Sequence, residues 1–190
     1  MMNLKDARVT SMFDFHRAFG LLINGFIWWY ITRTAMDKML SDVGARENQL
    51  LITWAVYYIA VVSFGVLGAL LAEKTARIKL LKLWIIVGTV VSCLPIFVGS
   101  FPSESIFFTA LLFGGSFGFG MPSCLAYFGD SVVIEKRGSK AGVVFLSTNL
   151  VAACLMVTLQ MFNSSLIAIA IIGTVWRSLG LTVFVGVTSE

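Results

Sequence analysis

Charged residues are scarce in this chain of 190 residues, because Asp, Glu, Lys and Arg make up 13% of it, against about 25% in soluble domains. Apolar residues make up 58%, and the mean hydropathy is +0.90. The few charges gather in short clusters that are separated by long apolar runs. This composition excludes a soluble enzyme domain and indicates an integral membrane protein.

Histidine and cysteine are scarce as well, which limits the chemistry open to the chain. There is one histidine, His16, and the three cysteines, Cys93, Cys124 and Cys154, are each isolated within an apolar run. These residues cannot supply a disulfide framework or a recognisable metal-ligand cluster, so we expect no metal and no cofactor. Although the sequence pI is about 9.1, the basic residues border apolar runs instead of alternating with aromatic residues. We therefore expect no nucleic-acid partner.

Six apolar runs, bounded by charged or turn-forming residues, are long enough to cross a bilayer, since a helical span needs about 20 apolar residues. A membrane β-barrel would instead show segments of about ten residues that alternate apolar and polar positions. The sequence thus predicts an all-α integral membrane protein with a cytoplasmic segment, 1–16, and one six-helix transmembrane domain, 17–187. The expected spans are 17–35, 50–72, 80–99, 105–128, 141–162 and 166–187, with short turn-forming links at 101–104 and 163–165.

The placement of lysine and arginine predicts the orientation of these spans, because loops rich in these residues stay in the cytoplasm. Only Lys38, Arg46 and, near a span end, Arg33 fall on the opposite side. We expect a multi-pass protein of the cell membrane, surrounded by the lipid bilayer, with both termini in the cytoplasm. The bases on the cytoplasmic side are Lys5, Arg8, Arg17, Lys74, Arg77, Lys79, Lys82, Lys136, Arg137 and Lys140.

The link between the second and third expected spans places an acid before several bases. The acid can pair with a base, while the bases hold the loop at an anionic membrane surface, so charge alone indicates a positive-inside loop. The segment contains Leu71, Ala72, Glu73, Lys74 and Arg77, with Ala69 and Ala76 before Leu71 and Arg77. This spacing resembles the loop signature of the major facilitator superfamily, Gly-x-Leu-Ala-Asp-Arg-x-Gly-Arg, with the two alanines at the glycine positions.

Two further segments extend this resemblance in the expected order along the chain. After the fourth span, Gly129 and Asp130 lead into the residues 135–138 and then Gly142, similar to the acidic and Arg-Gly loop that opens helix five in that superfamily. Before the second span, the residues 42–44 resemble the segment that leads into helix two. The resemblance covers roughly 20–162.

The resemblance implies the amino-terminal six-helix half of a secondary transporter, built from two inverted three-helix repeats that work by alternating access. Family members have twelve helices in two halves with the substrate between them, so this chain would supply half a cavity. The second half could be a missing carboxy-terminal half, a homodimer partner or another chain, and the lack of a basic loop after the last span favours truncation. The implied cytoplasmic gating residues are Glu73, Lys74, Arg77, Asp130, Glu135 and Arg137.

Arg177 falls near the middle of the last expected span, where an arginine costs about 2.5–3.5 kcal/mol to insert. Either it faces an aqueous cavity and attracts an anionic group, or it snorkels to the interface, or the helix ends there. Its charge favours a small solute with an anionic group, and the coupling ion is undetermined. The candidates for lining a substrate cavity are Asn24, Arg33, Asp37, Asn149 and Arg177.

The other polar candidates each leave two interpretations open. Arg33 and Asp37 are four residues apart, so they form either a cavity-lining ion pair or the charged end of an interfacial belt with Trp28, Trp29 and Tyr30. Polar residues in the fifth span, such as Asn149, either bind a ligand or make interhelical hydrogen bonds.

Small residues in two spans predict close helix packing, because helices in lipid associate mainly through such contacts. Gly114 and Gly118 form a small-xxx-small pair in the fourth span, and Gly65 and Gly68 lie in the second. Pro122 is expected to kink the fourth span.

An enzyme is not expected. Residues 114–117 resemble the serine motif of rhomboid intramembrane proteases, but a serine nucleophile needs a histidine base within hydrogen-bond distance. The one histidine, His16, precedes the first span. The sequence favours membrane transport of a small solute, and the alternative is a non-transporting six-helix scaffold or assembly subunit, which would show no solute flux.

Overall fold

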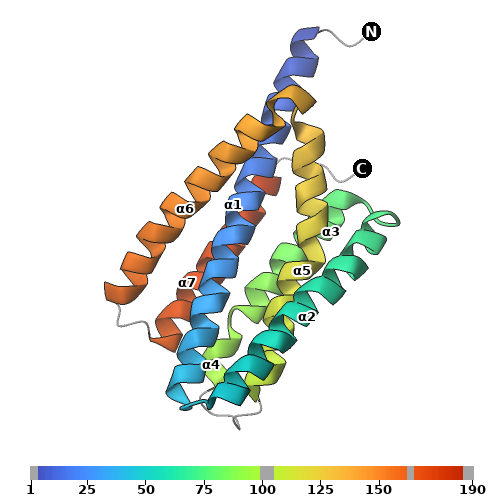
Figure 1. The fold of residues 1–190 in the computed structure, drawn as a ribbon. Coiled ribbons are helices and arrows are strands. Elements are labelled where there is room, and N and C mark those ends of the chain that lie inside the picture. Colours follow the sequence, from blue (N-terminus) through green and yellow to red (C-terminus); the bar gives the residue numbers. More distant parts are fainter. Residues whose placement is uncertain (1–3, 99–104, 162–164, 186–190) are drawn as a thin grey trace.

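The computed structural model describes residues 4–98, 105–161 and 165–185, which form a bundle of long helices (Figure 1). No strand occurs among these described residues, so the predicted all-α fold is confirmed. The elements are α1 (Leu4–Asp42), α2 (Glu47–Ala72), α3 (Arg77–Val91), α4 (Leu94–Val98), α5 (Ser105–Ser131), the 3-10 turn η1 (Ile134–Lys136), α6 (Arg137–Met161), α7 (Leu166–Leu179) and the 3-10 turn η2 (Gly180–Phe184).

Within the described residues, five helical segments are long and apolar enough to cross a membrane. They agree with five of the six expected spans and support the membrane class. The first expected span, 17–35, lies within α1, which has 39 residues but is less apolar because polar residues such as Asn24 and Arg33 interrupt it. The five segments are Glu47–Ala72, Arg77–Phe97, Ser105–Ser131, Ile134–Met161 and Leu166–Phe184.

The helix α1 lies inside the bundle, with α6 and α7 on one side and α5 on the other (Figure 1). Leu21, Ile27, Trp28 and Met36 along its length are fully buried. Because neighbouring helices cover much of α1, it can carry a polar residue such as Asn24, which would be costly against hydrocarbon.

The helices α2 and α6 lie at the periphery of the bundle. The helix α2 packs mainly on α5, and α6 packs mainly on α1. As a result, only 17% of the most apolar stretch of α2, and 22% of that of α6, is buried inside the protein. Large apolar side chains, among them Ile59 on α2 and Leu146 on α6, cover their outer faces. Such continuous apolar faces are suited to contact with lipid tails.

The close contact between α2 and α5 depends on three of the four glycines that the sequence singles out for packing, Gly68, Gly114 and Gly118. A Cβ added at Gly114 would overlap the backbone oxygen of Tyr57, and one at Gly118 would overlap that of Val61. From the other helix, a Cβ at Gly68 would overlap the backbone oxygen of Phe119, while Gly65 faces Gly118. Only a residue without a side chain allows the two backbones to approach this closely.

The third expected span, 80–99, is interrupted in the structure by a break between α3 and α4. Pro95 has no backbone N–H, so it cannot donate to the carbonyl of Val91, and the helix turns at Ser92 and Cys93 before α4 begins. The expectation of an uninterrupted helix over 80–99 was therefore wrong at this proline. By contrast, α5 continues through Pro122 without interruption.

The helix ends also differ from the expected boundaries. The helix α1 extends beyond 17–35 at both ends and ends before Gly44, whose φ of 61° turns the chain towards α2. The helix α6 begins at Arg137, and the end of the last expected span, 186–187, lies outside the described residues together with 99–104 and 162–164. The helix α7 is capped by Ser165, whose Oγ accepts a hydrogen bond from the backbone N–H of Ala168 at 3.2 Å.

The α2–α5 contact gives a prediction for stability. Replacing Gly68 or Gly118 with alanine (G68A or G118A) forces the backbones apart and is expected to destabilise the protein by about 1–3 kcal/mol. The corresponding fall in the unfolding midpoint is roughly 5 °C, measured by thermal unfolding of the detergent-purified protein. The control is G142A on α6, where an added Cβ meets nothing within 4 Å. Equal midpoints for all three variants would show that the close contact is absent in solution.

Candidate functional site

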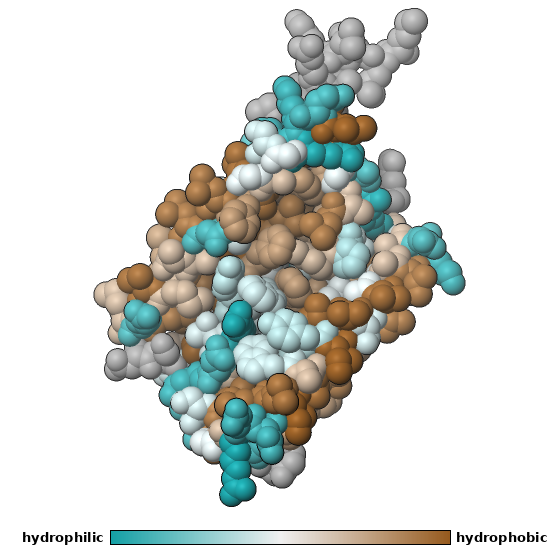
Figure 2. All heavy atoms as spheres, in the orientation of Figure 1, coloured by the Kyte–Doolittle hydropathy of each residue, from teal (hydrophilic) through white to brown (hydrophobic). Residues whose placement is uncertain are grey.

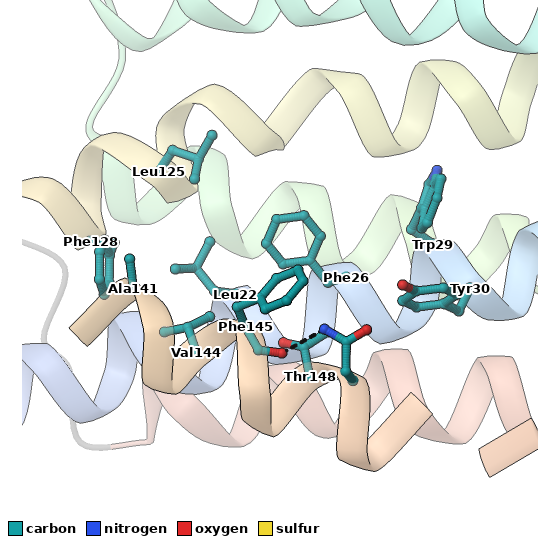
Figure 3. Close-up of a pocket in the computed structure, with 11 residues that line it drawn as sticks. Leu22, Phe26, Trp29, Tyr30, Leu125, Phe128, Ala141, Val144, Phe145 and Thr148 are labelled. Carbon is teal, nitrogen blue, oxygen red and sulfur yellow. Dashed lines mark hydrogen bonds between the residues drawn. The ribbon is translucent and has the colours of Figure 1, made fainter. Parts of the chain in front are cut away.

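A groove of about 430 Å³ lies between α1, α5 and α6, on the face of the bundle that is turned towards the viewer in Figure 2. Its volume is within the range of small-molecule sites. Leu22, Phe26, Trp29 and Tyr30 form its α1 wall, because residues three to four apart share one helical face (Figure 3). The other walls consist of Leu125 and Phe128 on α5 and of Ala141, Val144, Phe145, Thr148 and Asn149 on α6.

The polar groups in this groove are few. Thr148 is 5% exposed, and its hydroxyl has no hydrogen-bond partner among the described residues. Asn149, one of the expected cavity residues, does line the groove, and its side-chain amide donates to the backbone oxygen of Phe145 at 2.8 Å (Figure 3). The groove is therefore an aromatic and aliphatic cavity with a small number of polar atoms, as is typical of small-molecule sites.

Arg33 and Asp37 lie one turn apart, beyond Trp29 on α1, and both are exposed. The guanidinium carbon of Arg33 lies 5.8 Å from the ring centre of Trp29 and 5.6 Å from that of Trp54. No carboxylate of the described residues lies within 4 Å of this guanidinium, so the expected Arg33–Asp37 ion pair is not formed. Desolvation raises the pKa of the Asp37 carboxyl above its ordinary value, and the charge of Arg33 opposes that rise.

Arg177 is 0% exposed and lies in the core between α1, α3 and α7, not in the groove. Its guanidinium donates to the side-chain oxygen of Asn24 at 2.7 Å and makes a longer contact of 3.5 Å with the backbone oxygen of Trp84. The same guanidinium lies over the rings of Trp84, at 4.0 Å, and Trp28, at 4.9 Å. The charge is thus stabilised by two aromatic faces and an amide, and among the described residues no acid pairs with it.

Glycines make room for this cluster. A Cβ at Gly88 would overlap Nε of Arg177, one at Gly120 would overlap the ring of Trp84, and one at Gly180 would overlap the side chain of Asn24. The indole N–H of Trp84 donates to the backbone oxygen of Ser116 at 2.8 Å, which fixes the ring between α3 and α5. The guanidinium of Arg177 is therefore tightly enclosed by the side chains around it.

Trp28 differs from its expected place in an interfacial belt. It is fully buried, and its indole N–H donates to the hydroxyl of Ser92 at 2.6 Å. Asn24, expected to line a cavity, does line a second hollow of about 230 Å³ between α1, α7 and η2, and its amide donates to the backbone oxygen of Trp176 at 2.7 Å. The interior of α1 is thus hydrogen-bonded to α3 and α7.

Of the six expected gating residues, the structure brings two together. Arg77, at the start of α3, forms an ion pair of 2.5 Å with Asp130, near the end of α5. The Nε of Arg137 donates instead to the backbone oxygen of Val132 at 3.1 Å. The other three, Glu73, Lys74 and Glu135, are exposed, and no described residue forms an ion pair with them.

No group of three or more metal-ligating side chains occurs in the residues that the structure describes. Comparison of the chain with protein-family models, with curated proteins and with solved structures finds no match. The α1 groove residues Phe26, Trp29 and Tyr30 were not predicted as a site. Their helical spacing on α1 was the available signal, but it does not distinguish a groove wall from a buried helix face.

The Arg177 cluster gives a second prediction. N24L removes the amide that accepts from the buried guanidinium, and we expect a loss of about 2 kcal/mol or more, measured as a lower unfolding midpoint of the purified protein. The double variant N24L/R177M also lacks the guanidinium, so no buried charge is left without an acceptor. This variant should therefore be more stable than N24L alone. A double variant destabilised by the sum of the two single changes would contradict the pairing.

Proposed function

We propose that the chain is a six-helix half of a major facilitator-type secondary transporter, which moves a small solute across the cell membrane by alternating access. The observation that carries this proposal is the Arg77–Asp130 ion pair. These two residues come from the two separate loops whose sequences resemble that superfamily, and they lie 53 positions apart in the chain. A contact between them is what a cytoplasmic latch between helices requires.

The groove on α1 supports the same proposal. It is open along one face of the bundle and is walled by three helices, as expected for one half of a cavity that a second half completes. That second half would be a carboxy-terminal half, a second copy of the chain or a partner chain. Both termini and the basic α2–α3 and α5–α6 links would lie in the cytoplasm.

The proposal is tested by substitutions that remove or exchange the charges of the Arg77–Asp130 pair. Membrane vesicles from the native cells, in which the second half of the cavity is present, are assayed for uptake of radiolabelled carboxylates, with and without an imposed proton or sodium gradient. R77Q should lower gradient-dependent uptake at least tenfold, whereas the amount of folded protein stays the same, because an exposed ion pair contributes little to stability. The exchanged pair R77D/D130R should recover part of the uptake.

The matched control is K79Q, which removes one positive charge from an exposed residue near the start of α3 that forms no ion pair with the described residues. Uptake by K79Q should equal that of the unchanged chain. Absence of gradient-dependent uptake of any carboxylate from well-expressed protein would instead favour the alternative, a non-transporting scaffold or assembly subunit.

A further inference from the structure

We infer that the groove binds an elongated, mostly apolar solute with one anionic group, whose apolar body lies along α1 and whose anionic group lies at Arg33. This inference rests on the proposed function and names the class of its substrate. It commits to a small amphiphilic anion, not to a lipid headgroup of the bilayer.

The shape of the groove argues for an elongated ligand. Its α1 wall extends from Leu22 through Phe26 to Trp29 and Tyr30, and the helical spacing continues on the same face to Arg33. Eleven residues of helix separate Leu22 from Arg33, which corresponds to roughly 16 Å at 1.5 Å per residue. An extended molecule with an aromatic or alkyl body fits such a slot.

The polarity of the groove changes along its length. One end has only apolar side chains, including Leu125, Phe128 and Val144, and these lie away from Trp29 and Tyr30 in Figure 3. In Figure 2 the upper part of the hollow is correspondingly apolar, whereas paler, more polar side chains occupy its lower part. The ligand is therefore expected to be apolar at one end and polar at the other.

The groove contains an unsatisfied hydroxyl, and a positive charge lies outside its lining, next to Trp29. The buried Thr148 hydroxyl lacks a partner among the described residues, which calls for a ligand atom that hydrogen-bonds. None of the groove-lining residues is charged, while Arg33 lies against the ring of Trp29, which is part of the groove wall. Because no described carboxylate pairs with Arg33, its guanidinium can bind an anionic group of the ligand.

Arg177 cannot supply this charge. It is fully buried beneath α1, and its guanidinium is enclosed by Trp28, Trp84 and Asn24. The charge recognition in this inference is therefore assigned to Arg33 alone.

The experiment measures equilibrium binding of two tritiated probes, ω-phenylhexanoate and its neutral amide, to the purified chain in phosphatidylcholine nanodiscs. Empty nanodiscs give the partition into lipid. We expect saturable binding of the carboxylate above this background. R33Q should weaken binding of the carboxylate about tenfold and leave that of the amide within about twofold, since only the carboxylate interacts with the guanidinium.

Two further variants separate the apolar body from the charge. A141F fills the apolar end of the groove from an exposed position on α6 and should weaken both probes by a similar factor. K38Q is the matched control, because it removes a positive charge from the next turn of α1, where Lys38 pairs with Asp42, and it should change neither affinity.

Two outcomes with phosphatidylcholine nanodiscs would overturn the inference: carboxylate binding no higher than in empty nanodiscs, or equal carboxylate affinity of R33Q and the unchanged chain. A third is the loss of carboxylate binding when phosphatidylglycerol replaces phosphatidylcholine. The last outcome would mean that an anionic lipid fills the site. Because binding is measured without transport, saturable binding with no gradient-dependent uptake would refute the proposed transport and leave the ligand class standing.

Discussion

The buried guanidinium of Arg177 is the interaction around which the interior of this bundle is arranged. It joins α7 to α1 through Asn24 and to α3 through Trp84, so one side chain fixes three helices relative to one another. Burying a charge is costly, and two aromatic faces and an amide acceptor offset part of that cost, while Nε of Arg177 has no hydrogen-bond partner among the described residues. The close approach requires three glycines around this cluster, Gly88, Gly120 and Gly180.

This arrangement gives α1 two different faces. One face contains Asn24 and Trp28 and is hydrogen-bonded to α7 and α3 in the core. The other face contains Phe26, Trp29 and Arg33 and forms the groove wall and its charged end. Because the core face is fixed by hydrogen bonds, the groove face is held in a defined orientation between α5 and α6. The packing of Arg177 and the shape of the groove are thus linked through a single helix.

The helical class, five of the apolar spans and the glycines of the α2–α5 contact could be predicted from the sequence, because they depend on local composition and on small residues at helical spacing. The family resemblance implies a cytoplasmic cluster of Glu73, Arg77, Asp130 and Arg137, of which the structure pairs Arg77 with Asp130. The core position of Arg177 could not be predicted, since it depends on Trp28 and Trp84, which come from other helices. The break near Pro95 has a clear local signal, because a proline lacks the backbone N–H that an uninterrupted helix needs.

The most direct test of the account is whether the groove faces water or lipid in a membrane. Nitroxide spin labels at N149C, in the groove, and at L150C, on the outer face of α6, are compared in lipid vesicles after the native cysteines are replaced. The account predicts that the label at 149 collides with a water-soluble nickel chelate and the label at 150 with oxygen dissolved in the bilayer. If both labels respond to oxygen alone, the groove is a lipid-facing surface and does not carry a solute.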